Sequence, residues 1–148
     1  MKAFLVCYNC KRGHNYSIDD DFCIFCKDRI LDPGIKELVF SLNNSGIRTE
    51  RSCEGHEGSD WHYDFPWVVI SFEKDLTKLE GIIDAYNSFV RPLRDLSLWE
   101  VSFNVEGLRY WLVPKEKQRT VVRLRKDSAY LAKFISKYSK SFCGVSMG

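Results

Sequence analysis

Long hydrophobic runs are absent from the sequence. Its apolar stretches are short, as at Trp67–Ile70, whereas a membrane-spanning helix needs roughly 20 consecutive apolar residues. The first residues, Met1–Val6, form too short an apolar segment for the core of a signal peptide, and no small-residue cleavage site follows them. The sequence therefore predicts a cytoplasmic protein that does not associate with membranes.

Low-complexity segments and internal repeats are absent as well, and the chain holds only 4 proline and 9 glycine residues among 148. These absences exclude fibrous, linker-like and disordered classes of protein. Hydrophobic residues make up 45% of the composition and aromatic residues 14%, which is enough material for a buried core. At this length we expect one globular domain with a small appendage.

Cysteine is the least ordinary part of the composition. Four of the six cysteines fall in two C-x2-C pairs, with twelve residues between the pairs. In a chain without a signal peptide, such pairs favour a metal site over disulfide bonds. Each pair bends the backbone into a tight turn, or knuckle, and two knuckles give the tetrahedral sulfur site that zinc prefers. The four predicted zinc ligands are Cys7, Cys10, Cys23 and Cys26.

The pattern of these ligands resembles a zinc ribbon, which we expect over residues 1–31 and call the N-terminal unit. Zinc ribbons bind nucleic acid, contact other proteins or simply hold a short hairpin together, and the last role is the commonest. His14 is an alternative ligand that four cysteines make unnecessary. The pattern therefore predicts the zinc ion and does not select among these functions.

The remaining residues, 32–148, are predicted to form a second domain. Apolar residues recur every three or four positions in its helical segments and every second position in its strands. In chain order we expect a helix over 35–42, a strand over 47–52, a strand over 67–72 in the middle of the sheet, a helix over 73–91, a hairpin with strands over 99–105 and 108–113, a strand over 119–125 and a last helix that begins at Asp127 or Ser128. Adjacent strands separated by helices indicate an α+β fold, with a mainly antiparallel sheet and helices packed on it.

The 52–58 loop (Ser52–Gly58) is the densest run of reactive side chains, with a thiol, an imidazole and two carboxylates beside two glycines. One interpretation is a second metal site formed by Cys53, His56 and His62, with an acidic neighbour as a further ligand. A second is an enzyme in which His56 activates the thiolate of Cys53, with Glu54 as the third catalytic residue. A third, structural interpretation makes Cys53 a small buried thiol and His56 an ordinary hydrogen-bonding residue.

A fourth interpretation is a ligand-binding loop. Its glycines permit backbone N–H groups to approach a phosphate or carboxylate, and nearby arginine side chains would add positive charge. The predicted ligand-binding residues around this loop are Arg48, Thr49, Arg51, Ser52, Gly55 and His62. Three aromatic residues that follow, Trp61, Tyr63 and Phe65, would either stack on bases or cover the edge of the core.

Charge is divided unevenly along the chain. Residues 1–106 carry 12 lysines and arginines against 18 acidic residues, whereas residues 107–148 carry 10 against 2. This division predicts either an anionic partner for the C-terminal third, such as nucleic acid, or contact between the two halves. The basic residues predicted to bind such a partner are Arg119, Arg123 and Arg125, with lysines along the last helix as further phosphate contacts.

Residues 35–73 also resemble two families. The motifs that carry the resemblance are Gly46–Thr49, Ser52–His56 and the strand at Pro66–Phe72. They are similar to a group of small bacterial and phage proteins with an S-C-E-G-H loop, and to the wybutosine-pathway tRNA methyltransferase family, which has an S-C-S-G-R loop after a similar strand. This sequence has Glu54 and His56 where the methyltransferases have serine and arginine, and it adds the N-terminal zinc ribbon. The second resemblance implies RNA modification, with shared positions at Thr49, Ser52, Cys53 and Gly55.

Together these features predict a zinc-binding protein that binds nucleic acid or another anionic partner through its basic C-terminal third, with a ligand-binding loop over 52–62. The alternative is an enzyme, RNA-modifying or metal-dependent, with an active site at Cys53, Glu54 and His56. A further alternative is a phage-type module that binds or inhibits a protein partner. The sequence leaves these classes open.

Overall fold

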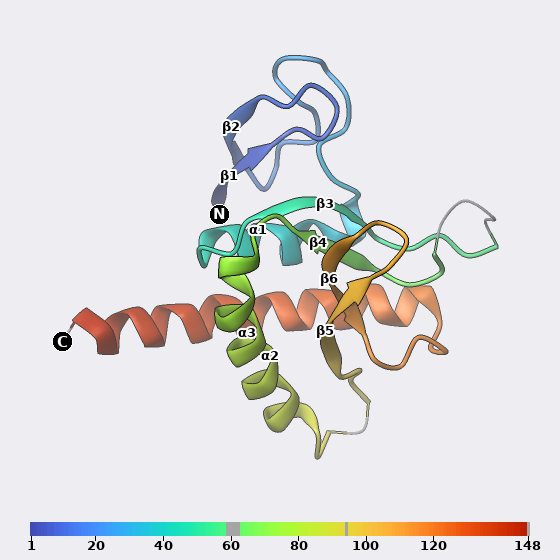
Figure 1. Ribbon diagram of the computed structural model, residues 1–148, viewed down its shortest axis with the longest axis vertical. Helices are drawn as coiled ribbons and strands as arrows, with labels where there is room; N and C mark the ends of the chain where they lie inside the picture. The colour runs from blue at the N-terminus through green and yellow to red at the C-terminus, as the bar shows by residue number, and fades with distance from the viewer. Residues whose placement is uncertain (59–62, 94, 148) are drawn as a thin grey trace.

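The computed structural model describes residues 1–58, 63–93 and 95–147, and describes side chains as far as residue 139. Two antiparallel sheets and three α-helices make up this part of the chain, so the fold is α+β as predicted (Figure 1). The elements in chain order are β1 (Lys2–Val6), β2 (Gly13–Ser17), the 3-10 helix η1 (Pro33–Ile35), α1 (Lys36–Asn44), β3 (Thr49–Cys53), β4 (Trp67–Ile70), the 3-10 helix η2 (Glu73–Asp75), α2 (Leu76–Val90), β5 (Trp99–Asn104), β6 (Arg109–Pro114) and α3 (Val121–Met147).

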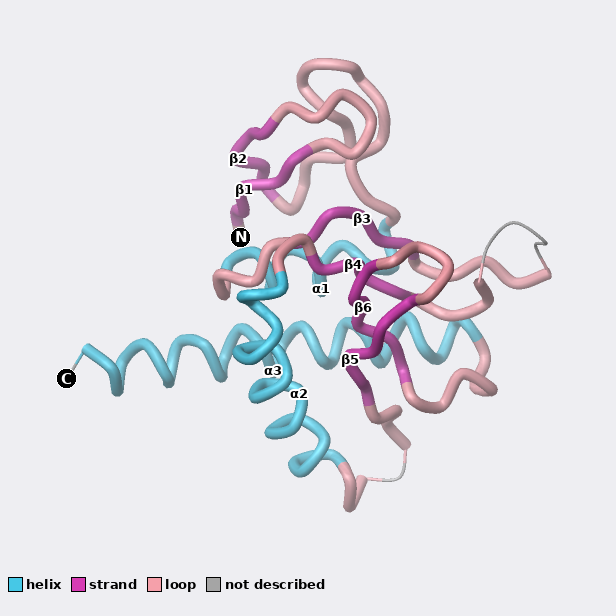
Figure 2. The backbone as a smooth tube through the Cα atoms, viewed as in Figure 1, coloured by secondary structure: helices cyan, strands magenta, loops and turns pink. Residues whose placement is uncertain are grey.

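The N-terminal unit consists of the β1–β2 hairpin followed by a long stretch of loop (Figure 2). It lies beside α1 and β3, at the top of the view in Figure 1. Alternate residues of the hairpin, among them Leu5 and Tyr16, are buried in the same hydrophobic cluster as the helices of the second part of the chain. The N-terminal unit therefore shares a core with the larger sheet.

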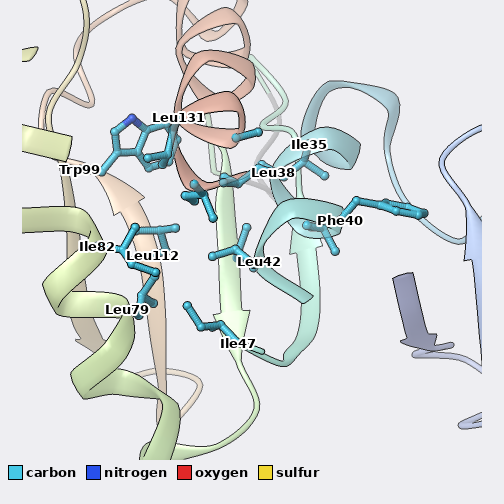
Figure 3. Packing of buried hydrophobic residues seen from close by; sticks show 14 of the residues in the cluster. Ile35, Leu38, Phe40, Leu42, Ile47, Leu79, Ile82, Trp99, Leu112 and Leu131 are labelled. Atoms are coloured by element: carbon cyan, nitrogen blue, oxygen red, sulfur yellow. The ribbon is translucent and has the colours of Figure 1, made fainter. Parts of the chain in front are cut away.

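The larger sheet has the strand order β3-β4-β6-β5, and every neighbouring pair is antiparallel. β4 is an internal strand, as its apolar sequence predicted. One face of the sheet packs against all three α-helices, where Leu42, Leu79 and Leu131 surround Leu112 of β6 (Figure 3). This side holds the main core, because the apolar stripes of the amphipathic helices are buried there.

The opposite face of the sheet carries a second, smaller buried cluster that includes Val69, Trp111 and Val113. Residues directly opposite each other on neighbouring strands point to the same face. Arg51 is opposite Val69, and Cys53 is opposite Trp67. β3 therefore places Arg51 and Cys53 on the face that carries the smaller cluster.

The predicted strand over 119–125 is wrong, because α3 begins at Val121 and continues to Met147. Asp127 and Ser128 lie inside this helix and do not cap it. Leu124 is buried, whereas Val122, which would share its face in a strand, is 57% exposed. The buried positions of α3 recur every three or four residues, which is the spacing of one helix face. Further along, Leu131 and Ile135 continue this buried face.

α3 is the longest helix in the described part and packs against α1 (Figure 1). None of the described helices is both long and apolar enough to cross a membrane.

Candidate metal centre and ligand cavity

The four cysteines of the N-terminal unit lie together. The Sγ atoms of Cys7 and Cys26 are 3.7 Å apart, those of Cys10 and Cys23 are 3.6 Å apart, and all four lie within 4.8 Å of one another. Two thiolates bonded tetrahedrally to one zinc ion at about 2.3 Å would be separated by about 3.8 Å, whereas a disulfide needs about 2.05 Å. The four thiols are therefore free and close enough to hold one metal ion, as the C-x2-C spacing predicted.

The two knuckles have the same backbone geometry. Lys11 donates its N–H to the carbonyl of Cys7 at 2.8 Å, and Lys27 donates its N–H to the carbonyl of Cys23 at 3.0 Å. Each lysine directly follows the second cysteine of its pair and has a positive φ, 64° for Lys11 and 70° for Lys27. A left-handed conformation at a non-glycine residue is uncommon, so its occurrence at both equivalent positions indicates two knuckles of one kind.

Local hydrogen bonds divide the protons of the cluster unevenly in the absence of an ion. The backbone N–H of Cys26 and then the hydroxyl of Tyr16 lower the pKa of Cys23 to about 6. The backbone N–H of Arg12 acts in the same direction on Cys10, but burial and the neighbouring thiols outweigh it and raise the pKa of Cys10 to about 11. Metal binding requires all four thiols to lose their protons, so its affinity depends on pH.

The 52–58 loop leaves the end of β3 and turns sharply at Gly55, where φ is +88°. A side chain at this position would meet the backbone of Phe65 and the side chain of Val121, each at 2.8 Å from an added Cβ. Glycine is therefore required here both for the left-handed backbone and for space. The turn brings the side chains of Cys53 and His56 into one group.

Asp32 completes this second group, which the sequence did not predict. The carboxylate oxygen Oδ2 of Asp32 lies 3.7 Å from Nε2 of His56 and accepts the backbone N–H of Glu54 at 3.2 Å. One ligand atom each from Asp32, Cys53 and His56 lies within 4.8 Å of the others. Asp32 directly precedes the 3-10 helix η1, but its side chain makes no capping hydrogen bond there. No local spacing signals this contact, because Asp32 is 21 positions before Cys53.

Glu54, predicted as a catalytic residue, is held away from Cys53 and His56 by other partners. Its carboxylate accepts the backbone N–H of Gly34 at 3.2 Å and pairs with Nε of Arg125 at 3.3 Å. Arg125 also donates to the carbonyl oxygens of Glu54 and Gly55. Arg125, predicted to bind an anionic partner, thus fixes the base of the 52–58 loop.

Burial raises the pKa of the Cys53 thiol, and the negative charges of Asp32 and Glu54 act in the same direction. The backbone N–H of Gly55, 3.4 Å from the sulfur, opposes them. A raised pKa keeps the metal-free thiol protonated at neutral pH. This state counts against the predicted catalysis by a Cys53 thiolate, because only the thiolate is a strong nucleophile. His62, which was predicted to join this site, lies outside the described residues, as does Trp61.

A cavity of about 880 Å³ opens beside Cys53, between the N-terminal unit and the face of the sheet that carries the smaller cluster. Its walls come from β1, from the strands β3, β4 and β6, and from the turn between β5 and β6. Tyr8, which directly follows Cys7, also lines it. Asp32, Cys53 and His56 all line it. The volume lies within the range of about 300–1,000 Å³ typical of small-molecule sites.

Arg51 is the basic residue of the cavity wall. Its guanidinium lies over the rings of Tyr8 and Trp67, 5.4 Å and 5.8 Å from their centroids, and donates to the Tyr8 hydroxyl at 3.2 Å. No described carboxylate lies within ion-pair distance of it. Of the other predicted ligand-binding residues, Thr49 and Ser52 also line the cavity, whereas Arg48 and Gly55 do not.

The aromatic residues after the loop cover the core edge. Phe65 is buried, and Tyr63 packs against both Phe65 and Trp111 with ring centroids 5.1 Å and 5.2 Å away. Tyr63 also donates its hydroxyl to Glu106 at 2.9 Å. Of the two interpretations of these rings, the structure favours packing for Phe65, while Tyr63 still forms part of the cavity wall.

The basic C-terminal third makes several ion pairs with the acidic first part of the chain. Within the C-terminal third, Arg119 pairs with Glu116 and lies 3.9 Å from Asp127, whereas Arg123 reaches the first part of the chain and donates to the carbonyl of Asp95 at 2.6 Å. Four pairs join a cation after residue 106 to an acidic residue before it: Arg109–Glu50, Lys117–Glu100, Arg123–Asp95 and Arg125–Glu54. Of the two explanations of the charge division, contact between the halves is therefore observed for part of the charge.

Comparisons of the chain with models of protein families, with curated proteins and with solved structures find no match. The resemblances to phage proteins and to tRNA methyltransferases therefore stay predictions, and function has to be inferred from the thiol cluster and the cavity.

Proposed function

We propose that the protein is a zinc-dependent binding protein. One zinc ion held by the four thiols of the N-terminal unit fixes one wall of the cavity, and the cavity binds a small anionic ligand with a planar ring, such as a nucleotide. The observation that carries this proposal is that Tyr8, next to the first knuckle cysteine, lies over Arg51 of β3. The N-terminal unit thus contributes directly to the binding surface.

The chemistry of the walls supports this class of ligand. Arg51 offers donors that match a phosphate or carboxylate, and it has no described acidic partner that would neutralise it. Tyr8 is 52% exposed, with Lys11 3.9 Å and Arg51 5.4 Å from its ring centroid. A planar ligand that displaces one of these cations could stack on it, as bases stack on the aromatic residues of single-stranded nucleic-acid sites. The two glutamates of the cavity already have partners, Glu50 with Arg109 and Glu106 with Tyr63, which limits their repulsion of an anion.

The test is the binding of nucleoside monophosphates to the zinc-loaded protein, measured by isothermal titration calorimetry. We expect Arg51→Gln to weaken binding by about 10- to 100-fold, because a hydrogen bond to a charged group contributes about 1.5–3 kcal/mol. Arg48→Gln is the matched control, since Arg48 lies over the ring of Phe72, outside the cavity, and we expect it to leave binding unchanged. Equal effects of both variants, or equal affinity for the uncharged nucleosides, would contradict the proposal.

A second candidate function is contact with the backbone of nucleic acid through α3. Lys126, Lys133 and Lys137 are exposed, and none of them forms an ion pair with another described residue. Their spacing of seven and four residues places them on one side of the helix. Unlike the three predicted arginines, which pair with carboxylates, these lysines have no described acidic partner. Their ammonium groups are therefore available to an external phosphate.

Salt dependence distinguishes this second candidate. If the lysines contact phosphates, replacing all three with glutamine should reduce the slope of log K against log salt by about 3, measured by fluorescence anisotropy with single-stranded RNA and duplex DNA. The control variant removes the same charge outside α3, at Lys2, Lys74 and Lys115. If both triple variants change the slope equally, the lysines of α3 form no specific surface.

A further inference from the structure

We propose that Asp32, Cys53 and His56 form a second metal site, separate from the four-thiol cluster, that binds a zinc-like divalent ion and leaves one coordination position open to the cavity. The proposal does not depend on the identity of the ligand proposed above. It rests on the geometry of the loop, the set of donor atoms and the position of the three residues on the cavity wall.

One support is that the 52–58 loop repeats an N–H···S hydrogen bond of a knuckle of the four-thiol cluster. In that cluster the N–H of Phe25 donates to the sulfur of Cys23 at 3.4 Å, and the second ligand, Cys26, follows three residues after the first. In the loop the N–H of Gly55 donates to the sulfur of Cys53, also at 3.4 Å. His56 stands three residues after Cys53 and shares its group. The C-x2-H segment therefore shares this contact and the ligand spacing with a metal knuckle, while its turn differs, because the positive φ falls at Gly55, two positions after Cys53.

Asp32 supplies a third donor from a different part of the chain. Its Oδ2 lies 3.7 Å from His56 Nε2, close to the separation of about 3.3–3.8 Å expected between two ligands of one tetrahedral zinc ion. Sulfur, nitrogen and carboxylate oxygen together are a set that zinc accepts, whereas magnesium and calcium prefer oxygen alone. The backbone N–H of Glu54 donates to the same carboxylate at 3.2 Å and so orients it toward the site.

Contacts behind the loop hold this arrangement without taking part in it. Arg125 donates to the carbonyls of Glu54 and Gly55 and pairs with the Glu54 carboxylate at 3.3 Å. The backbone N–H of His56 donates to the carbonyl of Tyr63 at 2.9 Å and so links the 52–58 loop to the segment before β4. Metal sites depend on such outer contacts to fix the direction of their ligands.

Among the described residues no fourth donor joins this group, so a remaining coordination position would face the cavity. Cys53 is 5% exposed, but the side chains of His56 and Asp32 are 40% and 30% exposed, and all three line the cavity. Three protein ligands and an open position are typical of zinc sites that bind a substrate or activate water. Arg51 lies two residues before Cys53 on the same face of β3, about 6.6 Å along the strand. An anion of phosphate size bound to the ion would therefore also approach the guanidinium.

The experiment is metal stoichiometry and cobalt spectroscopy on the full chain, with zinc or cobalt chloride as the only added probe. We expect two ions per wild-type chain, and one ion in each of the variants Asp32→Asn, Cys53→Ser and His56→Asn. In the cobalt form, Cys53→Ser should remove about one fifth of the thiolate-to-metal charge-transfer absorption, because one of five thiolates is lost. Glu57→Gln, an exposed carboxylate of the same loop, is the control and should retain two ions.

Two outcomes would overturn the proposal: one ion per wild-type chain in excess zinc, or a second ion that persists in all three variants. If Cys53→Ser does not fold, His56→Asn decides, because its side chain is partly exposed and its loss leaves no buried cavity. Retention of the first ion in that variant shows that the four-thiol cluster is intact. The loss of one ion can then be assigned to the second site.

Discussion

Cys23→Ser will lower the free energy of unfolding of the zinc-loaded protein by about 4 kcal/mol or more. This is the stabilisation that a ligand provides when its free concentration exceeds its dissociation constant about 1,000-fold. For a chain of this size it corresponds to a fall of roughly 10 °C in melting temperature. Cys23 is fully buried among the four thiols, so a serine leaves three ligands and a poorly matched hydroxyl.

The loss of stability will affect more than the N-terminal unit, because this unit shares its core with α1. Leu5 and Tyr16 belong to the same buried cluster as Phe40, whose side chain extends from α1 toward the N-terminal unit in Figure 3. Phe40 is fully buried, and α1 packs against β1 of that unit. Unfolding of the unit exposes this aromatic ring, and burial of a side chain of this kind contributes about 1.5–3 kcal/mol.

Thermal unfolding followed by circular dichroism, with and without a chelator, measures this effect. The chelator should lower the melting temperature of the wild type by much more than that of Cys23→Ser, because the variant has only the ion of the proposed second site left to lose. Cys143→Ser removes a thiol outside both C-x2-C pairs and serves as the control, with a retained chelator effect. A wild type that unfolds at the same temperature with and without chelator would show that the ion does not support the fold.

The sequence predicted the elements whose pattern is local. Amphipathic stripes located α1 and α2, strict alternation located the β5–β6 hairpin, and the C-x2-C spacing located the thiol cluster. In each case the residues that meet are close in the sequence, or the pattern repeats with a fixed period. Such features are visible in a single sequence because their physical cause acts over a few residues.

The start of α3 was missed because its buried face is partly polar. Asp127 and Ser128 occupy buried positions on the helix, where Asp127 accepts the backbone N–H of Ser97 at 3.3 Å and the Ser128 hydroxyl lies 3.1 Å from the carbonyl of Gly34. These polar residues resemble a helix cap in the sequence, and the valines before them resemble a strand. Their partners lie 30 and 94 positions away, so the sequence pattern alone could not show them.

The candidate site was only half predictable for the same reason. Cys53 and His56 are joined by their spacing, but Asp32 reaches them only because the chain leaves the N-terminal unit beside the end of β3. Arg125 was predicted to face an external anion, yet its partner is Glu54, 71 positions earlier. A charge excess in a sequence indicates that partners exist, and only the fold decides whether they lie in the same molecule.

Gly55→Ala will destabilise the protein by about 3 kcal/mol and will disable the second metal site. A left-handed backbone costs a non-glycine residue about 1–2 kcal/mol, and forcing a methyl group into a packed position costs about 1–3 kcal/mol more. The added Cβ would lie 2.8 Å from the backbone of Phe65, which cannot rotate away as a flexible side chain would. The turn must therefore move, and Arg125 then loses its alignment with the carbonyls of Glu54 and Gly55.

Gly58→Ala is the matched control within the same loop. Gly58 also has a positive φ, +74°, but an added Cβ would meet no atom within 4 Å. This variant should therefore lose only the backbone contribution of about 1–2 kcal/mol and should still bind two ions. Urea unfolding gives the free energies, and zinc stoichiometry gives the occupancy. Equal destabilisation by both substitutions would mean that the close contact at Gly55 relaxes without cost. The backbone turn, and not the packing behind it, would then be what aligns Cys53 with His56.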